Sequence, residues 1–122
     1  LQSLVVAQAA VTALVSAFGD SMLKFRLRDL PTGYEAYLVT QLSNEEAKKE
    51  TCRIEDTHPL GRLFDLDVID ADGVPMSRES VGLSPRKCLV CDNEARYCMR
   101  NRTHTMAELT AKIDEMIESY VR

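Results

Sequence analysis

The chain has 122 residues, 45% of them hydrophobic, which fits one small domain with a modest core. Its 19 acidic and 15 basic residues give a net charge of −4 at pH 7, which argues against a general nucleic-acid-binding protein, because phosphate backbones are bound by clustered positive charge. The apolar run from Leu4 to Phe18 is shorter than a bilayer requires and lacks the basic start of a signal peptide, so we expect neither a transmembrane segment nor a secretory leader.

The first part of the chain predicts a helix followed by a hairpin. Residues 4–18 are alanine-rich, apolar on most sides and followed by Gly19, a pattern that predicts a largely buried helix. Residues 24–30 and 34–40 alternate well enough for two strands, with a Pro-Thr-Gly turn between them. We therefore expect an antiparallel hairpin.

The middle of the chain predicts a polar helix and a second strand pair. Ser43-Asn44-Glu45-Glu46 is a capping-box sequence, after which a helix should run to about Thr57. Residues 63–69 are expected to form a third strand, and residues 74–77 a short return strand after a turn at residues 70–73.

The last part predicts a loop and a final helix. Residues 85–103 are expected to be mostly loop around cysteines, and a second capping box at residues 105–108 begins a C-terminal helix with an apolar stripe. The order of strand pair, helix, strand pair and helix predicts an α+β fold with a small, mainly antiparallel sheet and helices on one face. We interpret residues 1–122 as a single domain that has lost its N-terminus, because the chain enters an apolar helical segment at once.

Two carboxylates stand two residues apart in the apolar run of residues 63–69. In a strand, Asp65 and Asp67 would share one face, where they repel each other. Mg²⁺ or Mn²⁺ would remove that repulsion and leave positions open for a phosphate-bearing substrate. The alternative is two exposed carboxylates on the wet face of an edge strand. An EF-hand fits poorly, because the regular ligand spacing and the late glutamate are missing.

Three of the four cysteines cluster near a histidine. Cys88 and Cys91 form a C-x-x-C pair, and Cys98 and His104 follow, which makes a plausible Cys₃His zinc site. The segment has few apolar residues, so something other than a core must order it. The alternative is a set of small buried thiols; a thioredoxin-like role fits less well. Because Cys52 lies alone in a predicted helix, the cysteines favour a reducing cytoplasm over a secreted disulfide scaffold.

Basic residues flank both clusters. Arg62, Arg86 and Lys87 are candidates for binding phosphate. The basic stretch from Arg86 to Arg102 is either part of such a site or solvated charge. His58 could act as a base or a phosphate ligand, although a His-Pro pair before a turn is usually structural.

At this point several uncommon motifs stand together in one order. They are His58-Pro59-Leu60-Gly61-Arg62-Leu63-Phe64-Asp65-Leu66-Asp67-Val68, Ser77-Arg78, Gly82-Leu83-Ser84-Pro85-Arg86-Lys87-Cys88-Leu89-Val90-Cys91, and Cys98-Met99-Arg100 through His104. In order and spacing they resemble the holo-citrate lyase synthase family. The resemblance is strong from about Thr57 to His104 and weaker before that. Members usually carry an extra N-terminal strand and loop that this chain lacks, and Ser84 stands where a proline is common.

The resemblance implies an activity. The family transfers a phosphoribosyl-dephospho-coenzyme A group from triphosphoribosyl-dephospho-coenzyme A to a serine of the apo acyl carrier subunit of citrate lyase, and pyrophosphate is released. This looks like nucleotidyltransferase chemistry, in which Asp65 and Asp67 hold Mg²⁺ and the metal neutralises charge on the phosphates. Arg62, Arg86 and Lys87 would hold the triphosphate. The attacking serine belongs to the partner.

Two other functions remain open from the sequence alone. One is a non-catalytic, zinc-stabilised interaction module. The other is a small nucleic-acid-binding zinc protein, which the acidic balance disfavours. For the enzyme, the basic residues Arg96, Arg100 and Arg102 are the candidate docking surface for an acidic carrier protein, and solvated charge around a metal loop is the alternative.

Overall fold

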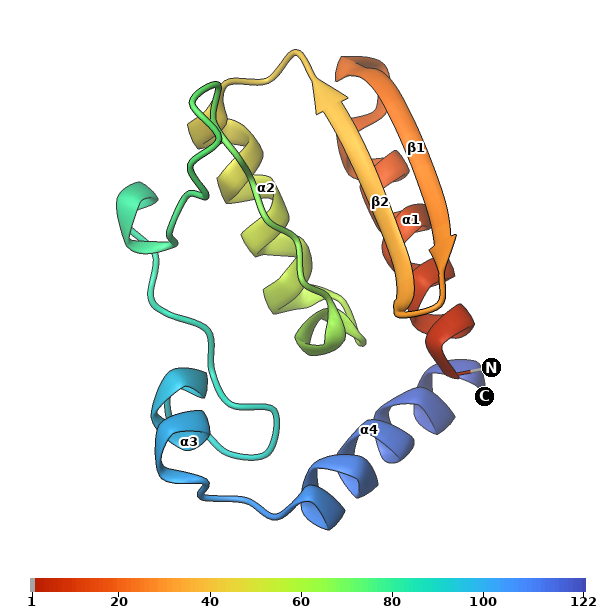
Figure 1. Ribbon diagram of the computed structural model, residues 1–122, viewed down its shortest axis with the longest axis vertical. Coiled ribbons are helices and arrows are strands. Elements are labelled where there is room, and N and C mark those ends of the chain that lie inside the picture. Colours follow the sequence, from red (N-terminus) through yellow and green to blue (C-terminus); the bar gives the residue numbers. More distant parts are fainter. Residues whose placement is uncertain (1) are drawn as a thin grey trace.

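The computed structural model describes residues 2–122 and contains four α-helices and one antiparallel hairpin. The elements, in chain order, are α1 (Gln2–Phe18), β1 (Met22–Leu30), β2 (Gly33–Thr40), α2 (Asn44–Thr57), α3 (Ala95–Asn101) and α4 (Met106–Val121). Figure 1 shows α1 behind the hairpin and α2 beside it, with the start of α1 next to the end of α4. The Gln2 amide donates a 2.6 Å hydrogen bond to the Asp114 carboxylate across that junction. The α+β class predicted from the sequence is confirmed.

The hairpin forms where the sequence predicts it. Phe25 lies opposite Leu38, and Leu27 lies opposite Ala36, so these apolar side chains share one face of the strand pair. Helix α1 packs against this face (Figure 1). The opposite face points away from α1 and carries three exposed basic side chains, those of Lys24, Arg26 and Arg28.

Helix α1 is less buried than its composition predicts. Ala9 and Phe18 are its buried residues, whereas Leu4 and Val15 are exposed. The expectation of a largely buried helix is therefore wrong, because β2, α2 and α4 contact α1 but leave part of its surface open. A 3₁₀ turn, Gly19–Ser21, follows α1 directly. The helical segment Gln2–Ser21 is therefore longer than the apolar run from Leu4 to Phe18. By length and composition alone, Gln2–Ser21 is long and apolar enough to cross a membrane, a property that core helices share.

The core lies between α1, α4, the end of α2 and the turn that follows α2. Leu60, in that turn, is 0% exposed. Four further buried residues form the cluster with it: Ala9, Ile54, Phe64 and Ile117. Gly61 has no room for a side chain, because a Cβ there would lie 2.2 Å from the carbonyl oxygen of Glu55. The chain therefore leaves the core at a fixed point, just before the two aspartates.

The strands predicted at residues 63–69 and 74–77 do not form. Within residues 2–122 the sheet has two strands, and this region contributes one isolated bridge, between Ile69 and Pro75. The segment after the 3₁₀ turn Gly61–Leu63 lacks a neighbouring strand, so its backbone finds other partners. The Leu66 amide donates to the Glu55 carboxylate at 3.1 Å. The prediction was wrong because alternation shows which side chains share a side, whereas a ladder also needs a strand to pair with.

Residues 85–103 are more ordered than the loop that the sequence predicts. They include helix α3, and Lys87 and Glu94 form a β-bridge before it. The Cys88 amide donates to the Asn93 carbonyl at 2.7 Å, and the Ala95 amide donates to the Arg86 carbonyl at 2.8 Å. The tight loop between these bonds places the cysteines close together. Helix α4 follows, and its predicted capping box of Thr105 and Glu108 is present.

Candidate functional site

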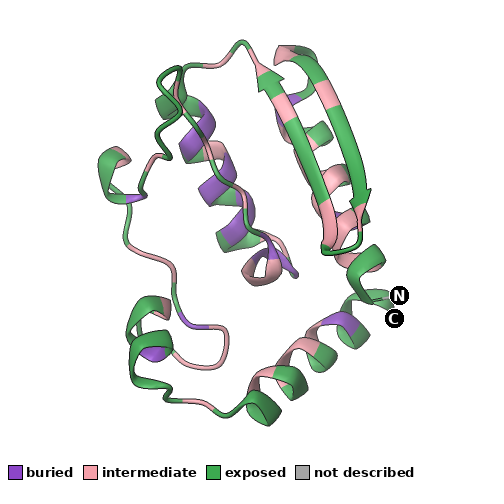
Figure 2. Cartoon of the chain, in the orientation of Figure 1, coloured by how far each residue is buried: buried purple, intermediate pink, exposed green. Residues whose placement is uncertain are grey.

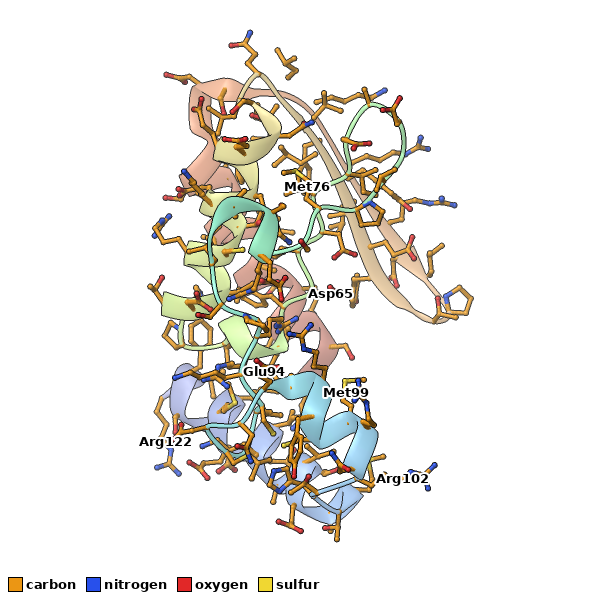
Figure 3. The ribbon with its side chains drawn as sticks, turned by 90° about the vertical axis from the view of Figure 1, so that its left-hand side faces the viewer. Asp65, Met76, Glu94, Met99, Arg102 and Arg122 are labelled. Carbon is orange, nitrogen blue, oxygen red and sulfur yellow. The ribbon has the colours of Figure 1, made fainter. Side chains whose placement is uncertain are left out.

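The two aspartates lie together on an extended segment beside α2. Asp65 and Asp67 are both exposed, and Figure 3 places Asp65 in the middle of the molecule, between the hairpin and the loop that leads to α3. Packing around the Asp67 carboxyl and then the negative charge of Asp65 raise the pKa of Asp67, while the ammonium of Lys48 opposes the rise. Asp65 therefore lies close enough to Asp67 for its charge to disfavour ionisation of the Asp67 carboxyl.

A buried carboxylate on α2 holds this segment in place. Glu55 is 5% exposed and accepts the Leu66 amide through Oε2. Its Oε1 accepts a 2.9 Å hydrogen bond from Arg78, which also donates to Asp56 at 3.0 Å. Nη1 of Arg86 lies 3.8 Å from Glu55 Oε2. The backbone between the two aspartates is thus fixed to a charge network that reaches the basic residues.

Beyond Glu55 lies a pocket of about 380 Å³ with a basic lining. The side chains of Arg62, Arg86 and Lys87, all selected from the sequence, line it together with Arg78. Because Glu55 and Asp56 neutralise Arg78, the other cations give the pocket its positive character. Arg86 donates to the Arg62 carbonyl at 2.8 Å, and Arg62 donates to the Cys88 carbonyl, so two of them are held by backbone contacts. Arginine and lysine side chains of this kind are suited to pair with phosphate oxygens.

His58 lies outside this pocket. Its Nδ1 accepts the Leu60 amide at 2.9 Å, and its ring packs 4.9 Å from that of Phe64 and 5.6 Å from that of Tyr120. Burial lowers the pKa of the imidazole, so it is neutral at pH 7. These contacts are those of a turn-stabilising residue, which was the structural alternative for His58.

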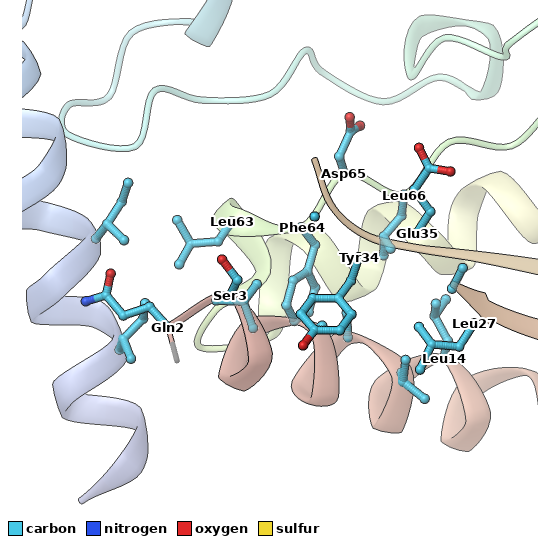
Figure 4. A pocket seen from close by; sticks show the side chains of 18 residues that line it. Gln2, Ser3, Leu14, Leu27, Tyr34, Glu35, Leu63, Phe64, Asp65 and Leu66 are labelled. Atoms are coloured by element: carbon cyan, nitrogen blue, oxygen red, sulfur yellow. The ribbon is translucent and has the colours of Figure 1, made fainter. Parts of the chain in front are cut away.

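A second cavity, of about 480 Å³, adjoins Asp65 on the side of α1 (Figure 4). It lies between α1, the hairpin, the segment around Phe64 and α4, and most of its lining is apolar. Asp65 and Glu35 stand on one side of it, and Tyr34 lies across its lower part. The carboxylate pair therefore has open space beside it as well as a basic pocket behind Glu55.

The three cysteines and the histidine of the predicted metal site come together. The ligand atoms of Cys88, Cys91, Cys98 and His104 all lie within 4.8 Å of one another. Sγ of Cys91 is 3.5 Å from Sγ of Cys98 and 3.4 Å from Nε2 of His104. Four donors bound at 2.0–2.3 Å around one tetrahedral zinc ion would stand roughly 3.5–4 Å apart. The donor set and its geometry could hold a metal such as zinc.

The electrostatics of the cluster favour the thiolate of Cys88 but not that of Cys98. Burial opposes ionisation of Cys88, but hydrogen bonds from the amides of Val90 and Cys91 outweigh it and lower the pKa of Cys88 to about 7. Burial raises the pKa of Cys98 to about 11. A thiol with a pKa near 7 is partly ionised at neutral pH. A metal cation that binds the cluster can therefore displace the thiol proton at little cost.

The histidine of the cluster has a partner on its other nitrogen. Nδ1 of His104 lies 3.6 Å from the Glu108 carboxylate, while Nε2 faces Cys91. Hydrogen bonds with the amide and hydroxyl of Thr105 lower the pKa of Glu108, which keeps it ionised. A carboxylate behind a histidine fixes the ring orientation in metal sites.

Comparison with known proteins identifies the family. A family model described as apo-citrate lyase phosphoribosyl-dephospho-CoA transferase matches residues 3–120. The chain belongs to this transferase family. The family recognised from the sequence motifs is therefore confirmed.

Relatives named "probable apo-citrate lyase phosphoribosyl-dephospho-CoA transferase" occur in distant bacteria. The protein of Vibrio cholerae serotype O1 (strain O395) is 49% identical over 112 residues, which cover 91% of this chain and 63% of that protein. The protein of Streptococcus pyogenes serotype M18 is 37% identical over 114 residues, which cover 90% of this chain and 59% of that protein. The chain thus spans about three fifths of the length of these transferases.

Two residues of this transferase-family site were not selected from the sequence. Glu55 lies in a helix that the sequence predicts to be polar, and nothing in that pattern indicates that its carboxylate is buried. Arg78 belongs to the Ser77-Arg78 motif, which contributed to the resemblance but received no role. The presence of Arg78 in a motif, without a role assigned to it, was the one sequence signal that pointed to this buried ion pair.

The Arg78–Glu55 pair should contribute strongly to stability. We expect Arg78→Leu to lower the free energy of unfolding by about 3–5 kcal/mol, because it leaves the buried Glu55 carboxylate without its main partner. The matched control is Arg53→Leu, which breaks an exposed arginine–glutamate pair on the same helix and should cost less than about 1 kcal/mol. Urea unfolding followed by circular dichroism measures both. Equal losses in the two variants would contradict a structural role for the buried pair.

Proposed function

We propose that this chain carries the active site of a transferase that modifies citrate lyase. It transfers phosphoribosyl-dephospho-coenzyme A from triphosphoribosyl-dephospho-coenzyme A to a serine of the apo acyl carrier subunit, and pyrophosphate is released. The single observation that carries the proposal is the family match over residues 3–120. The names of the relatives include both the citrate lyase acceptor and the transferred group.

The geometry supports a nucleotidyltransferase type of reaction. The partner's serine oxygen would attack the phosphorus next to the ribose, the bond to the pyrophosphate oxygen would break, and the serine proton would leave to solvent or base. Asp65 and Asp67 are suited to hold Mg²⁺ or Mn²⁺, because the charge of Asp65 disfavours the ionised form of Asp67 and a cation would remove that cost. When bound, the metal supplies charge neutralisation at the reacting phosphate and the leaving group.

The basic pocket provides a place for the leaving pyrophosphate. Arg62, Arg86 and Lys87 can pair with its negative oxygens, and the backbone contacts of Arg62 and Arg86 orient these side chains before substrate binds. Glu55 connects this pocket to the segment of the aspartates, so the reacting phosphate and the two phosphates behind it can be bound at adjoining places.

The cysteine–histidine cluster would hold a structural zinc ion. Its protein ligands fill four positions, which leaves none open for substrate, as in structural rather than catalytic zinc sites. The ion would order the loop that presents Arg86 and Lys87 to the pocket. Reduced thiolate ligands also fit the cytoplasmic location that we propose from the cysteine pattern. A purely structural, non-catalytic module is not favoured, because the carboxylate pair and the basic pocket are both in place.

The proposed transfer can be measured directly. The complete gene product is incubated with Mg²⁺, triphosphoribosyl-dephospho-coenzyme A and the apo acyl carrier subunit of citrate lyase. We expect mass spectrometry to show the carrier gaining one phosphoribosyl-dephospho-coenzyme A group, with one pyrophosphate released per group transferred. A carrier variant with its acceptor serine changed to alanine is the control. Unmodified carrier under these conditions would contradict the function.

A further inference from the structure

The outer face of the hairpin carries cations that the proposed chemistry does not use. Lys24, Arg26 and Arg28 alternate along β1 and are exposed, so their side chains leave the same face of the strand. Their partners on that face of β2 are Val39, Tyr37 and Glu35. Figure 2 colours most of β1 and half of β2 as exposed, and α1 lies behind the hairpin in this view. We call this surface, residues 24, 26, 28, 35, 37 and 39, the outer hairpin face.

The charge of the outer hairpin face is opposite to that of the chain. It has three cationic groups and one carboxylate, in a chain with a net charge of −4. Glu35 accepts a 3.0 Å hydrogen bond from the Tyr37 hydroxyl. Among residues 2–122, none of the three cations forms an ion pair within 4.0 Å. The cations are therefore available to an external acidic group.

Two largely apolar side chains of β2 lie opposite two of these cations, Tyr37 opposite Arg26 and Val39 opposite Lys24. Tyr37 is 55% exposed and Val39 is 50% exposed. Together with the three cations they line a shallow depression of about 260 Å³. Arginine and tyrosine are enriched where proteins bind each other, because they combine apolar contact area with hydrogen bonding. The surface fits a protein partner that presents carboxylates around a small apolar patch.

The outer hairpin face also borders the proposed active site. Tyr37 and Val39 contribute to a cavity of about 430 Å³ whose lining includes Asp65 and Asp67. A protein lying across the hairpin would therefore have a short path to the carboxylate pair. On and just after α3, Arg96 pairs with Glu94 at 2.9 Å and with Glu79 at 3.4 Å, which leaves Arg100 and Arg102 as the cations there that compete with the outer hairpin face.

We propose that the outer hairpin face docks an acidic protein that presents its acceptor group to the carboxylate pair. This inference rests on the proposed function, from which the partner is the apo acyl carrier subunit of citrate lyase. Arg26 and Arg28 provide the attraction, and Tyr37 provides the central contact. Docking here leaves the basic pocket behind Glu55 free for the small substrate.

Two matched charge reversals in the complete gene product test the proposal. Arg26→Glu with Arg28→Glu changes the outer hairpin face, and Arg100→Glu with Arg102→Glu makes the same change of charge on and just after α3. We expect the hairpin variant to weaken binding of the apo carrier by about tenfold or more, because like charges then face each other. The α3 variant should stay within about twofold. Added salt should weaken wild-type binding but not that of the hairpin variant.

Binding and labelling are measured separately, so that the two proposals can fail independently. Carrier binding is measured by titration calorimetry without the small substrate, and labelling by mass spectrometry. If the wild-type protein binds the carrier but does not label it, the result contradicts the proposed function and supports the docking surface. Carrier binding by the hairpin variant equal to wild type, equal weakening in both variants, or no wild-type binding would overturn the docking surface. The milder Arg26→Gln with Arg28→Gln variant replaces the reversal if circular dichroism shows that the reversal disturbs the hairpin.

Discussion

Asp65→Asn and Asp67→Asn should each reduce transfer to the carrier by about 10³-fold or more. An amide keeps the size of the carboxyl group but loses the charge that binds a divalent cation, and stabilisation of the phosphate charge in the transition state is lost with it. Initial rates of carrier labelling at saturating Mg²⁺ measure the effect. Asp72→Asn, an exposed aspartate in the following turn, is the matched control and should keep near-normal activity. A near-normal rate in either site variant would contradict the assignment of Asp65 and Asp67 as ligands of the divalent cation.

The Asp67→Asn substitution should not destabilise the protein. The pKa of Asp67 is raised in the folded state, so the native state binds its proton more tightly than the unfolded state does. Its contribution to stability is therefore favourable at low pH and is lost as the pH rises from 3.8 through the higher folded-state pKa. At pH 7, without a divalent cation, Asp67→Asn should melt no lower than wild type.

The effect of added Mg²⁺ on the melting temperature shows whether the aspartates bind the cation or only repel each other. Added Mg²⁺ should raise the melting temperature of the wild type and leave that of Asp67→Asn nearly unchanged, because a cation that binds the native state stabilises it by mass action. The buffers must be prepared without chelator, which would also remove a metal from the cysteine cluster. A wild-type melting temperature that is insensitive to Mg²⁺ would contradict metal binding by the aspartates.

The sequence was most informative where chemistry depends on short spacing. Residues two apart in an extended segment lie on one side whether or not the segment pairs as a strand, so Asp65 raises the pKa of Asp67 although the predicted strand does not form. The C-x-x-C spacing, one helix turn and a histidine before α4 likewise bring Cys98 and His104 to the pair.

The sequence was least informative where a contact joins distant residues. Glu55 and Arg78 are separated by 23 positions, and only the fold shows that they bury each other's charge. For His58 the sequence left a base or phosphate ligand and a structural role open, and the structure shows its Nδ1 accepting the Leu60 amide in a local turn. The missing third strand has the same origin, since strand formation depends on a neighbour that no local pattern specifies.

Protein purified without chelator should contain one equivalent of zinc, and Cys98→Ser should remove it. Serine keeps the size of the side chain but does not supply a thiolate, and the remaining ligands then bind zinc far more weakly. Zinc content by mass spectrometry measures this loss. Cys52→Ser is the control, because Cys52 is buried on α2 outside the cluster, and this variant should retain the full equivalent.

Loss of zinc should also weaken the basic pocket. Without the ion, the loop from Cys88 to His104 has little core of its own, so we expect the melting temperature to fall by about 10 °C or more. The Cys88 carbonyl holds Arg62, and the Arg86 carbonyl accepts a hydrogen bond from the first residue of α3. A disordered loop would release both arginines and raise the Michaelis constant for triphosphoribosyl-dephospho-coenzyme A. Metal-free protein with full stability and an unchanged constant would show that hydrogen-bonded thiols alone order this loop.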